Sequence, residues 1–234
     1  GVFLAIGIFV AIYTTLLFES GWASWLQFVN MTKFQITDPI FGLDLSFFIF
    51  VLPILRMILQ VFLPLLIGLL PITATIYLIF NPSQILGWRK QSLNPGQKHL
   101  LIQTGIFLIL LALNLIIQIF HLPLTSNPIM HGAGYTDVFV RLPGYLISAL
   151  VLMLTGITLF LGCRRWVLKK AFRRSVISLL VIAVTLFGLP PMVQSLLVEP
   201  NQFAKEKPYL ERHINMTQKA YGLDNIEIRQ FPKD

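Results

Sequence analysis

Charged residues are scarce in this sequence, and cysteine is nearly absent. Only 12% of the 234 residues are charged, whereas a soluble domain has about 25%. Because 56% of the residues are hydrophobic, the composition excludes an ordinary soluble globular fold and predicts an integral membrane protein. The single cysteine, Cys163, excludes an internal disulfide and any metal site built from cysteines.

Asp and Glu are missing from five long apolar runs, which we predict to be transmembrane helices. They lie near residues 1–18, 54–80, 100–120, 144–162 and 175–197, so that residues 1–197 form a polytopic domain. Without carboxylates, these spans do not support proton transport through an acidic relay. Trp22 and Trp25 suit the lipid headgroup region, so a short interfacial helix is predicted over residues 21–31.

Basic residues exceed acidic ones only in the apolar part of the chain. Up to Leu197 there are 12 Lys or Arg and 4 Asp or Glu, whereas the remaining residues contain six of each. The net charge of +8 therefore reflects orientation in a membrane and gives no support for a nucleic-acid partner.

A basic run between the last two spans determines the predicted orientation. Residues 163–174 contain no acid and six basic residues, namely Arg164, Arg165, Lys169, Lys170, Arg173 and Arg174. The loops after the second and fourth spans hold nine Lys or Arg, and those after the first and third hold two. This bias predicts that the basic run is a cytoplasmic loop, with a solvated basic face as the alternative.

The last part of the chain, residues 198–234, is soluble in character. Pro208 suits the first position of a helix, and Gly222 suits its end. Between them, the three- and four-residue spacing of a helix face is followed by Leu210, Ile214, Thr217 and Tyr221. Ile226 and Ile228 alternate with charged residues as in a half-buried strand. We expect an extracytoplasmic α/β domain to begin here, and the whole chain to be an internal piece of a longer protein.

Three stretches together resemble a known family. They read TDPIFGLDLSF at 37–47, GYTDV and RLP within 134–143, and VEPN, EKPYLER and AYGLD within 198–224. The chain is similar along nearly its whole length to an uncharacterised protein family of large bacterial membrane proteins, common in actinobacteria and cyanobacteria. The resemblance implies several spans followed by a long extracytoplasmic region, located at the bacterial plasma membrane. It implies no biochemical activity.

Six polar residues near the predicted outer face are candidate site residues: Asp38, Asp44, Arg56, Asp137, Arg141 and Glu199. With neighbouring His residues they suit a metal or proton site, but capping and turn chemistry is the simpler interpretation. Asp44 is expected to cap a helix that begins at Leu45 and breaks or kinks at Pro53. We expect Arg56 either to extend its guanidinium to the membrane interface or to pair with Asp44 or Asp38 across that break.

The sequence has no catalytic motif that we can identify, and we assign it no cofactor and no metal. The favoured function is a membrane anchor that orients a large extracytoplasmic domain, acting in scaffolding or binding of the cell envelope. The alternative is a transport or channel module gated by that domain. Predicted partners are the lipid bilayer, the remainder of the same chain, and envelope components or other membrane subunits. The segment 199–212 is expected to contact at least one of the two loop motifs, 38–44 and 134–141, with Asp137 or Arg141 among the partners.

Overall fold

The computed structural model describes residues 2–86, 93–125, 132–161 and 165–223. Within these ranges the regular structure is helical, apart from one isolated antiparallel bridge between Thr37 and Asp44. The predicted strand around Ile226 and Ile228 lies outside the described residues. The all-α character of the bundle is confirmed, and the α/β nature of the tail stays a prediction.

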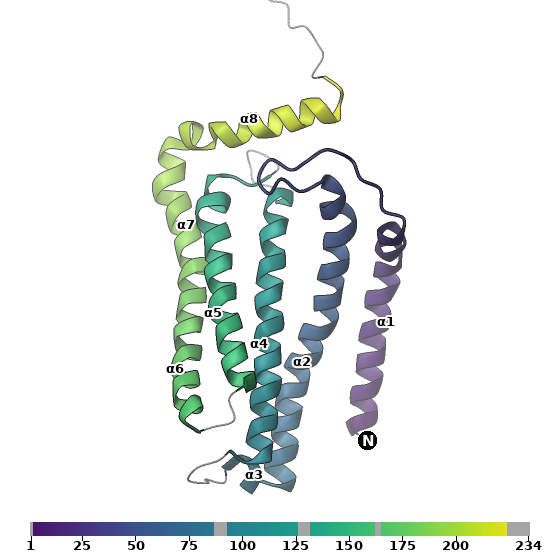
Figure 1. The fold of residues 1–234 in the computed structure, drawn as a ribbon, viewed down its shortest axis with the longest axis vertical. Helices are drawn as coiled ribbons and strands as arrows, with labels where there is room; N and C mark the ends of the chain where they lie inside the picture. The colour runs from purple at the N-terminus through teal and green to yellow at the C-terminus, as the bar shows by residue number, and fades with distance from the viewer. Residues whose placement is uncertain (1, 87–92, 126–131, 162–164, 224–234) are drawn as a thin grey trace, which may run out of the picture.

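Long helices run side by side and form the body of the molecule (Figure 1). They are α1 (Val2–Val29), α2 (Leu52–Phe80), α4 (Pro95–His121), α5 (Leu142–Leu161) and α6 (Arg165–Ile182), which continues towards α7 (Leu189–Val193). The short α3 (Ser83–Leu86) lies at one end, and α8 (Gln202–Ala220) lies across the other end. The loops that follow α1 and α4 are therefore at the same end of the bundle as α8.

Four helical stretches of the described chain are long and apolar enough to cross a membrane. They are Phe47–Phe80, Pro95–Leu124, Asp137–Leu161 and Arg173–Ala220. The last four predicted spans fall within these stretches, apart from Gly162, which lies outside the described residues. The first predicted span lies within α1, which runs alongside α2, and its crossing of the membrane stays a prediction.

The third span begins earlier than predicted, because a capping box starts α4 at Pro95. The backbone N–H of Asn94 donates to the Gln97 side chain at 3.1 Å, and the Asn94 side chain accepts in return from the first turn. Asn94 also donates to the carbonyl of Ser83 at 2.8 Å, which holds α3 against α4. Polar residues that were interpreted as loop therefore form the start of the helix.

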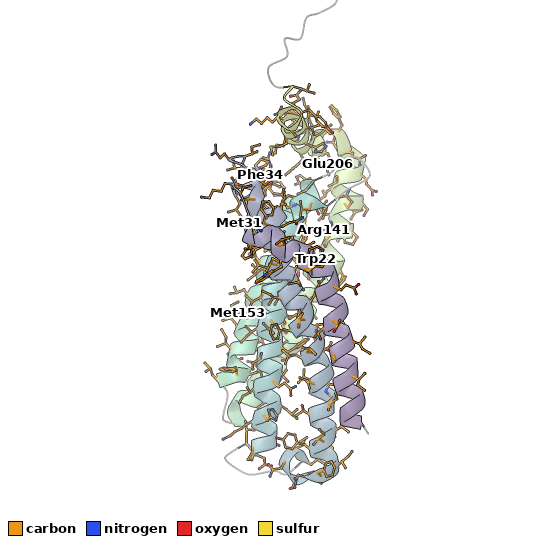
Figure 2. All side chains as sticks on the ribbon, turned by 90° about the vertical axis from the view of Figure 1, so that its right-hand side faces the viewer. Trp22, Met31, Phe34, Arg141, Met153 and Glu206 are labelled. Atoms are coloured by element: carbon orange, nitrogen blue, oxygen red, sulfur yellow. The ribbon has the colours of Figure 1, made fainter. Side chains whose placement is uncertain are left out.

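The predicted interfacial helix is the last part of α1 and no separate element. Figure 2 shows α1 turning aside near Trp22 and then running across the bundle end to Met31. Trp22 is 66% exposed and Trp25 is 52% exposed. Both indoles are therefore available to lipid headgroups, as the sequence predicts.

Of the predicted break or kink at Pro53, the break is wrong, because the helix continues through this residue. The helix that begins at Leu45 passes through a π-helical turn, η1 (Phe47–Val51), directly into α2, with Pro53 in its first turn. The wide turn tolerates a residue without a backbone N–H, so the chain continues without folding back. Pro64 and Pro71 also lie inside α2, which is continuous but not straight (Figure 1).

Small residues allow α4 and α5 to pack closely. A Cβ atom added to Gly105 would lie 2.8 Å from the carbonyl oxygen of Gly156, and the reverse substitution meets the carbonyl of Gly105 at the same distance. Farther along α5, the hydroxyls of Ser148 and Thr185 lie 2.9 Å apart and join α5 to the last span. These contacts are of the kind that hold helices together in lipid.

The basic run is not a loop throughout, because α6 begins at Arg165 and includes most of it. The remaining span contains two π-helical segments, η4 (Ala183–Gly188) and η5 (Gln194–Val198), on either side of Pro190 and Pro191. The two prolines lack backbone N–H groups, which explains the loss of regular α-helix expected there.

A 3-10 turn, η6 (Glu199–Asn201), redirects the chain into α8. The prediction that Pro208 begins this helix is wrong, because Pro208 lies inside α8 and Pro200 occupies the start of the turn. Gly222, with φ +65°, follows the end of α8, as predicted.

Candidate functional site

The end of the bundle covered by α8 collects most of the candidate residues. Asp38 is buried, and its Oδ2 atom accepts hydrogen bonds from the backbone N–H groups of Ile40 at 2.9 Å and Phe41 at 2.8 Å. The backbone N–H of Gly42 donates to the Asp38 carbonyl at 2.9 Å, and the left-handed φ of +66° at Gly42 favours glycine. Asp38 thus builds a rigid turn.

Asp44 fixes the other end of the same turn. Its Oδ1 accepts from the Ser46 N–H at 2.8 Å, as expected of a helix cap, and its Oδ2 accepts from the Gln35 N–H at 2.8 Å. Hydrogen bonds from the Ser46 hydroxyl and N–H, with smaller ones from Phe34 and Gln35, lower the pKa of Asp44 to about 2. The carboxylate is therefore charged at neutral pH and ties residues 34–46 together.

A second turn is built around Asp137 in the π-helical segment η3 (Asp137–Arg141). The Asp137 side chain is 2% exposed and forms a salt bridge with Arg141, with 2.7 Å between the nearest nitrogen and oxygen. Its other oxygen accepts from the Gly134 N–H at 3.0 Å. The buried charge is thus compensated within its own turn, which holds residues 134–136 in place.

Helix α8 is fastened to this second turn. Glu206, only 7% exposed, accepts a hydrogen bond from the backbone N–H of Tyr135 at 3.1 Å. The Lys205 ammonium lies 4.8 Å from the centroid of the Tyr135 ring. The Thr136 hydroxyl donates to the Gln194 side chain at 2.5 Å, just before the chain turns into α8. Figure 2 shows Glu206 at the same end of the molecule as Arg141.

The expected contact between the segment 199–212 and the motif 134–141 is therefore present. Its bonds come from Tyr135 and Glu206, whereas Asp137 and Arg141 support the turn from within. We define these four residues as the α8 clamp.

A cavity of about 270 Å³ lies between α8 and the first turn. Apolar side chains and backbone from residues 39–49, 123–124 and 132–133 form most of its wall. Tyr209, Arg212, His213 and Met216 line it from α8, and Asp38 lines it from the turn. Because Asp38 is engaged with backbone N–H groups, the cavity presents an apolar interior with a cationic rim at Arg212.

The remaining candidates lie apart from this arrangement. Glu199 is exposed at the start of η6. Arg56 is exposed on α2 and has no acid within ion-pair distance in the described chain, so the expected pairing with Asp44 or Asp38 is wrong. The physical reason is the continuous helix, because 12 residues of helix separate Asp44 from Arg56 by roughly 18 Å. Arg56 is instead near His121.

The structure describes five of the six basic residues that are predicted to determine the orientation of the chain in the membrane. Arg164 lies outside the described residues, and Arg165, Lys169 and Lys170 are placed by their backbone in α6. Arg173 and Arg174 are exposed on the same helix.

Sequence reasoning missed Glu206, which together with Tyr209 is buried in α8. The helix face that the sequence predicted to be apolar does not pack against the bundle, since its residues Ile214 and Tyr221 are 46% and 77% exposed. A usable signal was present, because Glu206, Tyr209, His213 and Met216 recur at the three- and four-residue spacing of one helix face.

Within the described ranges, no group of three or more His, Cys, Asp or Glu residues is placed to hold a metal ion. Asp38 accepts hydrogen bonds from backbone N–H groups, Asp44 accepts from backbone N–H groups and from the Ser46 hydroxyl, and Glu206 accepts from the N–H of Tyr135.

Comparison with known proteins identifies the family. The model of the uncharacterised protein family UPF0182 matches residues 1–234. The chain belongs to this family. It is 33% identical over 211 residues to a UPF0182 protein of Moorella thermoacetica, a match that covers 90% of the chain and 23% of the relative. It is 31% identical to a UPF0182 protein of Clostridium botulinum strain Langeland, covering 98% of the chain and 27% of the relative.

The chain thus spans about a quarter of the length of these UPF0182 relatives. A UPF0182 protein of Clostridium perfringens is 30% identical, over 90% of the chain and 24% of the relative. No solved structure matches.

Proposed function

We propose that this part of a UPF0182 protein anchors a larger polypeptide in the plasma membrane and sets the direction in which that polypeptide leaves the bilayer. The observation that carries the proposal is the α8 clamp. A helix of 19 residues with a polar, charged surface lies across the bundle end and is fastened by a buried glutamate. A flexible linker would need no such contact, whereas an orienting element does.

Orientation in the membrane is part of the proposal. The bias of basic residues supports a cytoplasmic position for the start of α6 and an outer position for α8. The arrangement of the helices supports this orientation, because successive loops alternate between the two ends of the bundle and α8 lies at the same end as the loops after α1 and α4. Envelope components or other membrane subunits are the partners that an outward-facing scaffold would hold.

Labelling of cysteines in intact cells tests the orientation. A membrane-impermeant thiol reagent is applied to the full-length protein, which has Cys163, and to a variant carrying Gln202→Cys with Cys163→Ser. We expect labelling of the second protein only. Labelling at Cys163 alone would reverse the proposed orientation.

Spin-label distances test the orienting role. Labels at Leu124, which is 57% exposed, and at the exposed Lys219 report how α8 sits on the bundle in the full-length protein. We expect a narrow distance distribution for the wild type and a broad one for Glu206→Ala. Glu211→Ala is the matched control, because Glu211 is 61% exposed and lies on the same helix. An equally narrow distribution for Glu206→Ala would refute the orienting role of the clamp.

A further inference from the structure

A second cavity lies between α1, α2 and α4. Its volume is about 270 Å³, and its polar lining consists of Ser24, Arg56, Gln60 and His121. The remaining wall is made of Gly21, Pro53 and Met57. The volume is smaller than the roughly 300–1,000 Å³ of sites for drug-sized ligands, and it suits a small polar group.

Two nitrogen donors in this cavity have no partner within the described chain. The Nε2 atom of His121 is buried and forms no hydrogen bond. The Arg56 guanidinium has no acid within ion-pair distance, although it is an intramembrane charge by the limits of the second span. A guanidinium carries only donors, and a neutral imidazole can present its N–H at Nε2. Together they match an anion and repel a cation.

The level of the cavity in the bilayer indicates where the anion comes from. Gly21 and Ser24, on its wall, flank Trp22 and lie where α1 turns aside (Figure 2). Exposed tryptophans mark the lipid headgroup region, and the exposed Trp25 directly follows Ser24 of the cavity wall. Phosphate oxygens at this depth can accept two parallel hydrogen bonds from one guanidinium.

We propose that Arg56 and His121 form a binding site for a phosphate-bearing anion, and that the headgroup phosphate of an anionic lipid occupies it. Arg56 provides the charge and a planar pair of donors. His121 provides a third donor from Nε2 on the neighbouring helix. Bound in this way, the lipid compensates an arginine that the protein itself leaves without a counter-charge, and it joins α2 to α4 beside α1.

Native mass spectrometry of the full-length protein tests the site. The protein is purified in detergent, and phosphatidylglycerol or phosphatidylcholine is added at matched concentrations. We expect preferential retention of phosphatidylglycerol, and a loss of its affinity by roughly tenfold to a hundredfold in Arg56→Gln, the range expected for hydrogen bonds to a charged group. Lys33→Gln is the matched control, because it removes an equal charge from an exposed position at the same end of the bundle.

Further variants distinguish a loss of lipid binding from a folding defect. Arg56→Lys keeps the charge and loses the planar donor pair, so we expect an intermediate affinity. His121→Phe keeps a ring of similar size without a donor and is expected to weaken binding by several-fold. Helix content and thermal unfolding in phosphatidylcholine nanodiscs should match the wild type, because phosphatidylcholine has no net charge and therefore supplies no anionic lipid that the variant could fail to bind.

Inorganic phosphate alone separates the two sources of the anion. A rise in Tm with inorganic phosphate that disappears in Arg56→Gln would identify a free anion as the ligand and support the site. A rise only with phosphatidylglycerol would identify the lipid and also support it. Equal retention of phosphatidylglycerol by the wild type and Arg56→Gln, or an equal loss in Lys33→Gln, would overturn the proposal.

Discussion

The contact between α4 and α5 at Gly105 offers a direct test of how the bundle is held together. In Gly105→Ala, the new methyl group would lie 2.8 Å from both the carbonyl oxygen of Gly156 and the backbone nitrogen of Phe160. Carbon atoms pack at about 3.5–4.0 Å, so the two helices would have to separate by several tenths of an ångström. Backbone atoms cannot rotate away as a flexible side chain can.

The expected magnitude follows from a matched substitution. Gly68 lies inside α2 with nothing within 4 Å of an added Cβ atom. Both Gly→Ala changes replace glycine, which has a low helix propensity, with alanine. This replacement alone stabilises the folded protein by roughly 0.5–1 kcal/mol in each variant. That gain cancels in the comparison, so the difference between the variants measures the steric cost, for which overpacking data give about 1–3 kcal/mol.

Unfolding of the full-length protein in mild detergent, followed by circular dichroism, provides the measurement. We expect Gly68→Ala to be at least as stable as the wild type and Gly105→Ala to be less stable than both. Equal stability of the two variants would refute the close approach of α4 and α5. A larger substitution, Gly105→Leu, should increase the loss, because even its Cβ atom would meet backbone atoms of α5 at 2.8 Å.

Three further predictions concern local contacts. The pKa of Asp44 is lowered from 3.8 to about 2, so its carboxylate stabilises the turn fully at pH values above 3.8 and loses this effect as the pH falls through about 2. Hydrogen exchange at the Phe34 and Gln35 amides should therefore accelerate in the wild type as the pH falls from 3.8 to about 2, and it should not respond to this pH change in Asp44→Asn. Ser148→Ala removes the hydroxyl contact with Thr185 and should cost roughly 0.5–1.5 kcal/mol in detergent unfolding, with no additional loss when Thr185 is changed to Val. Gly222→Ala introduces a side chain at a φ of +65° and should destabilise the end of α8 by about 1 kcal/mol, measured as faster hydrogen exchange at Leu223, whose N–H bonds to Gln218.

Length and hydropathy predict the helices of the bundle well, because the spans have to be apolar over a membrane thickness whatever surrounds them. The caps at Asp44 and Gly222 were also predictable, since each depends on one residue and its immediate neighbours. The start of α4 was missed because the capping box at Asn94 and Gln97 consists of polar residues that hydropathy assigns to a loop.

The effect of Pro53 was not predictable from sequence alone. A proline breaks an α-helix when the preceding turns are tight, but here the π-helical turn at 47–51 absorbs the missing hydrogen bond. Nothing in a run of Phe and Val marks that wider turn. The consequence for the proposed phosphate site is large, because a continuous helix moves Arg56 away from Asp44 and brings it beside His121 on another helix.

The role of Glu206 was equally hidden. Its partner is a backbone N–H that lies 71 residues earlier in the chain, and a backbone donor leaves no trace in the sequence. Only the tertiary arrangement of α8 and the turn at Asp137 makes this glutamate a buried acceptor instead of a surface charge.

The chain leaves the bundle at the end of α8, so the number of residues in α8 determines the position and direction of this exit. The 19 residues of α8 extend on the order of 28 Å, from the end of the last span towards the side of the bundle where α2 lies (Figure 1). One residue inserted into α8 between the clamp and Gly222 would turn the exit point by roughly 100° and advance it by about 1.5 Å. An insertion after Gly222 would alter neither quantity. Length changes within this family should therefore be tolerated beyond the glycine and selected against within the helix.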